Sequence, residues 1–239
     1  MAERIYPEGL RSNCFAGMYC EIAMESYVNA SNNFKVLSEN NYSILYAYEH
    51  IEMDKNVIKT IVFSAMAIES FLNNYAAACL GDSEFYCNFD KLSTMSKFQL
   101  IAKFILKSEI NKQSSCYYYL KSLFRLRDSY IHNKSSIEKI YGFSSVDEAN
   151  EFIQITYGDE LEEYEYHYNK DEINKDYKSA LNALKAIKEM ADYFDKYDGA
   201  RIATPILFHP SGILCGSKKE KEYKTQVFSE LNIKVDEML

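Results

Sequence analysis

The sequence has no tryptophan and is poor in turn-forming residues, with only three prolines and eight glycines among 239 residues. This scarcity argues against a loop-rich or disordered chain. Hydrophobic residues make up 47% of the sequence, which is enough for a substantial core. The composition therefore predicts a folded protein that consists of one large domain or of one domain with additions.

The sequence has no excess of basic residues: 27 lysines and arginines face 35 aspartates and glutamates, and the formal net charge at pH 7 is −8. A strongly basic chain would neutralise many phosphates and bind nucleic acids avidly whatever their sequence. The acidic total argues against tight, nonspecific binding of RNA or DNA, but it leaves room for a local basic groove.

Patterns that hold metals are missing as well. None of the six cysteines forms a Cys-x-x-Cys pair or has a histidine at zinc spacing. His50, His167 and His209 share no local metal-ligand pattern. We therefore expect no metal and no other cofactor.

The sequence also has no recognisable targeting signal. The N-terminus has no basic region followed by an apolar run, so we expect no signal peptide. No apolar run reaches the length needed to cross a bilayer. These features favour a cytoplasmic protein with reduced thiols and no membrane partner.

The most regular part of the sequence is an apolar stripe that predicts a long helix over residues 55–80, with Asp54 as its N-cap and Gly81 after its end. The stripe has spacings of three or four residues and consists of Val57, Ile61, Ala65, Ile68, Leu72, Tyr75 and Cys79. Glu69 lies next to it, and a carboxylate so surrounded by apolar residues usually has a partner.

Other segments also have helical spacing. Before the long helix, helices are predicted over residues 14–28 and from a cap at 31–33 to about 51. After it, helices are predicted from Ser93 or Thr94 to about 107 and from Ser114 or Ser115 to about 133. A further helix is predicted over 177–199. A short helix is predicted at 146–155, residues 206–215 resemble two short strands around a turn, and the charged tail from 218 suggests a short final helix.

Together these segments predict an all-α fold, an antiparallel bundle of about five core helices with a small C-terminal extension that contains the short hairpin. We place the bundle at residues 32–198, with an insertion at about 137–174. Residues 1–31 and 199–239 are assigned to N-terminal and C-terminal extensions.

The residues with the most chemical interest lie at 123–134, near the end of one predicted helix. Asp128 and His132 are four residues apart, so on a helix the carboxylate lies one turn before the imidazole on the same face. A carboxylate there can orient the ring and raise its pKa toward neutrality. Arg127 precedes Asp128, and Arg125 lies nearly in line with His132 on the helix surface. A cation, an imidazole and a carboxylate together could act on a phosphodiester without a metal.

An all-α bundle whose late helix carries this pattern resembles the HEPN superfamily. The motif of that superfamily is an arginine followed after four to six residues by a histidine, with a polar residue favoured directly after the arginine. Arg127, Asp128 and His132 match it at the shortest spacing. The segment 67–73, Ala-Ile-Glu-Ser-Phe-Leu-Asn, also looks like an earlier helix of that superfamily, in which Glu69 would be near the active site.

The resemblance implies metal-independent RNA cleavage at a cleft formed by a homodimer, in a toxin–antitoxin or phage-defence system, with an antitoxin or a nucleotidyltransferase as a further partner. In this reaction the ribose 2′-hydroxyl attacks the adjacent phosphorus. His132 would act as general acid or base, Arg127 would stabilise phosphoryl charge, Asp128 would orient His132, and Glu69 would position an arginine.

Two questions stay open at this stage. Arg125 also has the permitted spacing to His132 and lies closer to its face, but Leu126 follows it, so we favour Arg127 as catalytic. The alternatives to a nuclease are a HEPN-like module that binds a nucleotide or a partner without cleavage, and a structural dimerisation protein. Candidate substrate-binding residues form a separate set: Arg125, Tyr130, Asn133 and Lys134.

Overall fold

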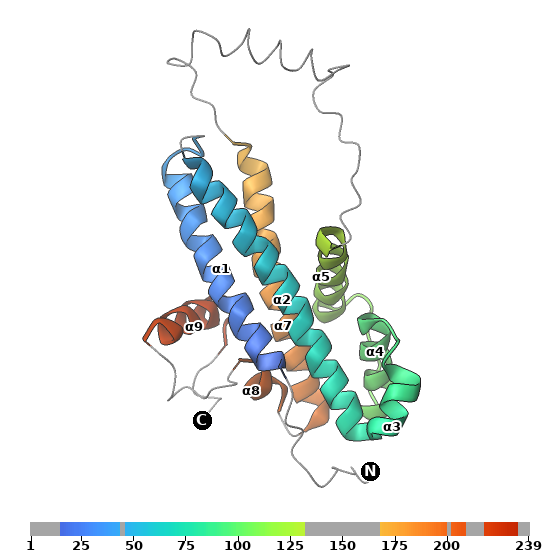
Figure 1. The fold of residues 1–239 in the computed structure, drawn as a ribbon. Coiled ribbons are helices and arrows are strands. Elements are labelled where there is room, and N and C mark those ends of the chain that lie inside the picture. Colours follow the sequence, from blue (N-terminus) through green and yellow to red (C-terminus); the bar gives the residue numbers. More distant parts are fainter. Residues whose placement is uncertain (1–14, 44–45, 132–167, 200–201, 209–217, 234–239) are drawn as a thin grey trace, which may run out of the picture.

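A computed structural model describes residues 15–43, 46–131, 168–199, 202–208 and 218–233. The fold is all-α, as predicted, and the described residues form helices without a β-sheet. Three long helices, α1 (Ala16–Glu39), α2 (Ala47–Leu80) and α7 (Lys170–Asp198), lie side by side (Figure 1). The fourth large helix, α5 (Ser115–Ile131), packs against α7 and α2.

Shorter helices surround this bundle. After α2 the chain forms α3 (Asp82–Glu84), a π-helical turn at Phe85–Phe89, α4 (Thr94–Leu100) and a second π-helical turn at Ile101–Ile105. These elements lie beside the C-terminal end of α2 (Figure 1). At the other side, α8 (Ala203–Phe208) and α9 (Lys218–Leu231) pack against α1 and α7.

The predicted apolar stripe forms the buried face of α2. Its first six members, Val57 to Tyr75, are all buried, and Cys79 is partly buried. Gly81 ends the helix with a φ of 84°, a left-handed conformation that glycine adopts without steric cost. The predicted start is wrong, because α2 begins at Ala47 and Asp54 lies two turns inside it.

Helix α1 also differs from the prediction. It is continuous from Ala16 to Glu39, so the break predicted at residues 31–33 is wrong, and the segment assigned to an N-terminal extension contains the first half of a core helix. The reason is a continuous apolar face on which Met24, Tyr27, Ala30 and Leu37 are completely buried. The polar residues do not interrupt this packing, because Asn32 is exposed and the half-buried Ser31 accepts a hydrogen bond from the Tyr177 hydroxyl of α7.

The start of helix α7 also differs from the prediction. Helix α7 begins at Lys170, seven residues before the predicted start, because the Asn169 side chain caps it by accepting hydrogen bonds from the backbone of Asp171 and Glu172. Gly199, with a φ of 73°, follows the end of this helix.

Residues 203–208 are helical, so the first of the two predicted strands is wrong. Asp195 of α7 accepts hydrogen bonds from the backbone of Ala203 and Thr204 and fixes the start of α8. Burial of Leu207 and Phe208 holds this helix on the bundle. The second predicted strand and the predicted helix at 146–155 lie outside the described residues, whereas the final helix is confirmed as α9.

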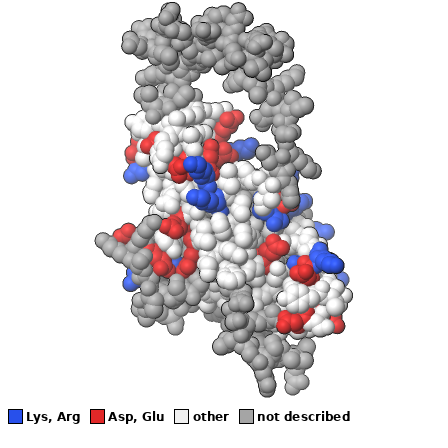
Figure 2. Space-filling view, viewed as in Figure 1, with Lys and Arg blue, Asp and Glu red and all other residues white. Residues whose placement is uncertain are grey.

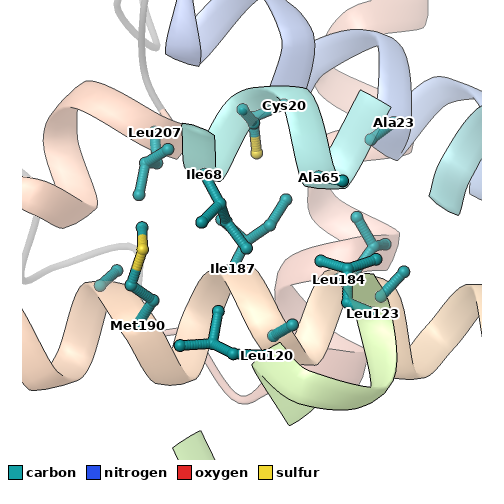
Figure 3. Close-up of a cluster of buried hydrophobic side chains, with 14 of the residues drawn as sticks. Cys20, Ala23, Ala65, Ile68, Leu120, Leu123, Leu184, Ile187, Met190 and Leu207 are labelled. Carbon is teal, nitrogen blue, oxygen red and sulfur yellow. The ribbon is translucent and has the colours of Figure 1, made fainter. Parts of the chain in front are cut away.

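The core joins α1, α2, α5, α7 and α8 through interlocking aliphatic side chains. Figure 3 shows Ile68, Ile187 and Met190 at its centre, with Leu120 of α5 and Leu207 of α8 on opposite sides. Full burial of such a side chain contributes about 1.5–3 kcal/mol. Among the helices that the structure describes, none has both the length and the apolar character that a membrane-spanning helix needs.

The continuity of α1 gives a direct prediction. We expect Asn32→Pro to lower the free energy of unfolding by about 3 kcal/mol or more, because proline inside a helix removes a backbone hydrogen bond and collides with the preceding turn. Urea unfolding followed by circular dichroism measures this, with Asn32→Ala as a control that should be neutral because Asn32 is exposed. A helix that started at residues 31–33 would accept proline there with little loss of stability.

Candidate functional site

The described part of the predicted motif lies on the last turns of α5. The Ser114 hydroxyl caps this helix by accepting a hydrogen bond from the backbone of Tyr117. Cys116, Leu120, Leu123 and Phe124 are the buried residues of α5. This packing fixes how the following turns, with Arg125, Arg127 and Asp128, face their surroundings. His132, Asn133 and Lys134 lie outside the described residues.

Arg127 is held between two carboxylates. Its Nη1 lies 3.7 Å from Glu69 Oε2 of α2, and its Nε lies 2.9 Å from Asp128 Oδ1. The guanidinium carbon is 5.5 Å from the centre of the Phe124 ring. The Arg127 side chain is 26% exposed, and its Nε is buried. Helices α5 and α2 therefore meet here through an ion pair, and the Phe124 ring of α5 supports the guanidinium from its own helix.

The ion pairs leave the hydrogen-bonding capacity of Arg127 unused. The 3.7 Å contact with Glu69 is too long for a hydrogen bond, and the short contact with Asp128 lacks the required alignment. None of the described residues accepts a hydrogen bond from this guanidinium, which has five N–H donors. Arg127 is thus positioned electrostatically, its Nε is buried, and the described residues leave the donors of its two Nη groups unoccupied.

Arg125 has a different environment. Residues two apart on an ideal helix point about 200° away from each other, so Arg125 and Arg127 face different sides of α5. Arg125 is exposed and forms no ion pair with any described residue. The structure thus brings Arg127, rather than Arg125, to the Glu69 that lies 58 positions earlier in the sequence.

A groove beside this site has a volume of about 580 Å³. We call it the aromatic groove, and it is lined by Phe15, Tyr19, Met66, Glu69, Ser70, Asn73, Asn74, Ala77, Asp82, Phe85, Tyr86 and Asp90. Glu69 belongs both to this groove and to the Arg127 ion pair. The sequence analysis missed the groove, because its lining comes from α1, α2 and the turns after α2.

A cluster of titratable residues joins α2, α5 and α7 and was also not predicted. His50 Nδ1 lies 3.8 Å from Asp54 Oδ2, and the His50 ring stacks on Tyr168 at 4.1 Å. Burial, reinforced by the Asp176 and Asp54 carboxylates, raises the pKa of Tyr130, a predicted substrate-binding residue. The signal in the sequence was the spacing of four between His50 and Asp54.

Charged side chains of both signs alternate over the face shown in Figure 2, and its described part carries no continuous basic surface. Within the described ranges, no three His, Cys, Asp or Glu side chains lie close enough together to hold a metal ion.

In comparisons with known proteins, no protein-family model matches the chain, no curated protein matches it, and no solved structure matches it.

The titratable cluster predicts an unusual effect of pH on stability. Burial first, and then repulsion by Asp54 and Glu172, raise the pKa of Asp176, while Lys175 and His50 oppose them. A raised pKa in the folded state means that Asp176 contributes most to stability below its unfolded pKa of about 3.9, and that this contribution is lost as the pH rises through the folded value. At neutral pH the ionised Asp176 is destabilising.

We therefore expect Asp176→Asn to raise the melting temperature at pH 7, with a smaller gain at pH 4. The matched control is Asp171→Asn, because Asp171 is exposed in the first turn of α7, where a carboxylate favours the helix dipole. This control should lower the melting temperature at pH 7. Differential scanning calorimetry at both pH values tests the pair, and a destabilised Asp176→Asn protein at pH 7 would contradict the assignment.

Proposed function

We propose that the protein is a metal-independent endoribonuclease of HEPN type that acts in the cytoplasm, in a toxin–antitoxin or phage-defence system. The observation that carries this proposal is the state of Arg127. Glu69 and Asp128 hold its guanidinium in place, its Nε is buried, and none of the described residues accepts a hydrogen bond from its two Nη groups, which are the donors proposed to bind a phosphate. The fit of Arg127, Asp128 and His132 to the HEPN motif supports the same conclusion.

In the proposed reaction the ribose 2′-hydroxyl of the RNA attacks the adjacent phosphorus, and the 5′-oxygen leaves. His132 removes the proton of the hydroxyl or protonates the leaving oxygen. Arg127 donates hydrogen bonds to the phosphoryl oxygens, on which negative charge accumulates in the transition state. Because the nucleophile belongs to the substrate, DNA lacks the group that reacts.

The proposed active form is a homodimer in which two copies of the motif face each other across a twofold axis. An isologous interface places the same residues from both chains at one cleft, so a second His132 can take the complementary acid or base role. Ile131, at the end of α5 that carries the motif, is 52% exposed and offers an apolar side chain for such contact. An antitoxin or a nucleotidyltransferase is the proposed regulatory partner.

A second candidate function has its own support. Two carboxylates of the same chain already neutralise Arg127, as expected for a structural ion pair in a helical dimerisation protein. The acidic lining of the aromatic groove, with Glu69, Asp82 and Asp90, is also unfavourable for the RNA backbone. The first observation favours the structural dimerisation protein, and the second favours a HEPN-like module that binds a nucleotide or a partner without cleaving RNA.

Cleavage of a mixed RNA pool in excess EDTA separates the two candidates. We expect Arg127→Ala to reduce the rate by about 10²–10³-fold, since it removes charge stabilisation in the transition state. His132→Ala should reduce it by about 10²–10⁴-fold, the usual contribution of a general acid or base. Arg125→Ala tests the alternative choice of catalytic arginine and should change the rate by only a few-fold, because Arg125 is exposed and faces another side of α5.

All variants are compared at equal circular dichroism signal and equal oligomeric state. Equal activity of the wild-type and His132→Ala proteins would point to another site and reject this mechanism. Absence of cleavage by the wild type, with and without added partner, would favour the binding module.

The Glu69 carboxylate tests the positioning of Arg127 separately. We expect Glu69→Gln to lower kcat by about 10–100-fold, because a misplaced catalytic group costs rate, with little change in KM. The ion pair is partly exposed, so the loss of stability should not exceed about 1 kcal/mol. Single-turnover cleavage and urea unfolding measure both effects. A drop in stability without a drop in kcat would assign Glu69 a structural role only.

A further inference from the structure

We propose that the aromatic groove binds one nucleobase of the RNA, next to the phosphate that Arg127 contacts, and that it selects bases that carry an exocyclic amino group. This inference rests on the proposed function. The groove and Arg127 share Glu69, so a base in the groove and a phosphate at Arg127 are neighbours. Its volume of about 580 Å³ is within the range of small-molecule sites.

Aromatic rings give the groove a surface on which a base can stack. Tyr86 is 63% exposed and Phe15 is 46% exposed, although large rings usually avoid such contact with water. Phe85 is buried behind Tyr86 and holds its ring edge-on at 5.3 Å. Stacking of a base on an aromatic side chain contributes about 1–3 kcal/mol and tolerates any base. The rings therefore explain binding but not selection.

Selection comes from Asn73, whose amide orientation is fixed from behind. The Lys97 ammonium donates a hydrogen bond to Asn73 Oδ1 at 2.8 Å and lies 5.9 Å from the centre of the Phe85 ring. Lys97 is only 2% exposed and forms no ion pair with any described carboxylate. Burial of a cation whose hydrogen-bonding partner is a neutral amide costs free energy, so the placement of Lys97 behind Asn73 indicates a role in orienting that amide. It leaves the Asn73 NH₂ group to donate into the groove.

The carboxylates supply the complementary acceptors. Glu69 and Asp90 line the same groove as Asn73 and can accept hydrogen bonds from an amino group. The groove therefore offers one amide donor, from Asn73, beside carboxylate acceptors. A base edge that has an amino donor beside a ring nitrogen or carbonyl acceptor is complementary to these groups, and adenine, cytosine and guanine have such an edge. Uracil has a carbonyl where cytosine has its amino group. A guanidinium has donors only, so it would meet the Asn73 NH₂ group unfavourably.

The carboxylates also determine how a strand can lie. They repel phosphates, so the sugar–phosphate backbone stays outside the groove, where Arg127 is the nearest cation of α5 that contacts its lining. Only the uncharged base enters. The acidic groove, unfavourable for a whole RNA strand, is thus compatible with one inserted base.

The absence of tryptophan from the chain allows a specific test. Tyr86→Trp places the single tryptophan of the chain in the groove. Phe104→Trp places it at an exposed position that does not line the groove. Both proteins are titrated with cytidine and uridine, which differ at the amino position of the base. We expect cytidine to quench Tyr86→Trp with a Kd at least about tenfold lower than that of uridine, equivalent to about 1.4 kcal/mol. Phe104→Trp should respond to neither.

Substitution of Asn73 in the Tyr86→Trp protein tests the selecting residue. Asn73→Asp keeps a partner for Lys97 but removes the NH₂ donor, and Asn73→Leu removes both. We expect both variants to lose the preference for cytidine. Arg127→Ala should keep it, because nucleosides carry no phosphate. Equal affinities for the two nucleosides, or quenching by L-argininamide and by neither nucleoside, would overturn the proposal.

The groove assignment and the proposed ribonuclease activity can be rejected independently of each other. Cytidine preference without any RNA cleavage would keep the groove assignment and reject the ribonuclease. Cleavage that depends on Arg127, without discrimination between nucleosides, would reject the groove assignment and keep the ribonuclease.

Discussion

Burial of the apolar face of α2 is the constraint on which the rest of the structure depends. This 34-residue helix contacts α1, α5, α7 and α8, and its rotation about its own axis is fixed by side chains such as Ile61, Ile68 and Leu72, which have no exposed surface. With that face fixed, Glu69 and Asn73 must lie along one flank of it. The ion pair with Arg127 and the hydrogen bond with Lys97 both follow from this orientation.

The electrostatics of the site are balanced rather than basic. Arg127 lies between two carboxylates, and the adjoining groove carries further negative charge, in keeping with the net charge of −8. Carboxylates that hold an arginine without accepting its hydrogen bonds keep it oriented while its donors remain available. A phosphate could therefore bind at Arg127 without first breaking a strong internal hydrogen bond, and nonspecific attraction of nucleic acid would remain weak.

Buried polar residues connect elements that apolar packing alone would leave free to slide. Lys224 of α9 contacts Glu21 of α1 and Glu220, and the Tyr75 hydroxyl donates a hydrogen bond to Asp198 at the end of α7. Desolvation lowers the pKa of the buried Lys224 ammonium, but hydrogen bonds to the two glutamates outweigh it and raise the pKa overall. Such contacts specify one arrangement of helices, since a displaced element would leave a buried charge unpaired.

The sequence by itself determined the all-α class, the apolar stripe of α2 and the glycines that follow α2 and α7, because these depend on local periodicity and backbone conformation. It predicted a break in α1, where Ser31 and Asn32 suggested a cap, and it misplaced the start of α7, because the true cap, Asn169, lay in the segment interpreted as an insertion. Only the tertiary structure decided that Glu69 meets Arg127 rather than Arg125, and that Asn73, Lys97 and Tyr86 border one groove. These contacts join separate helices, and their relative rotation is set by packing across the whole core, which no local pattern encodes.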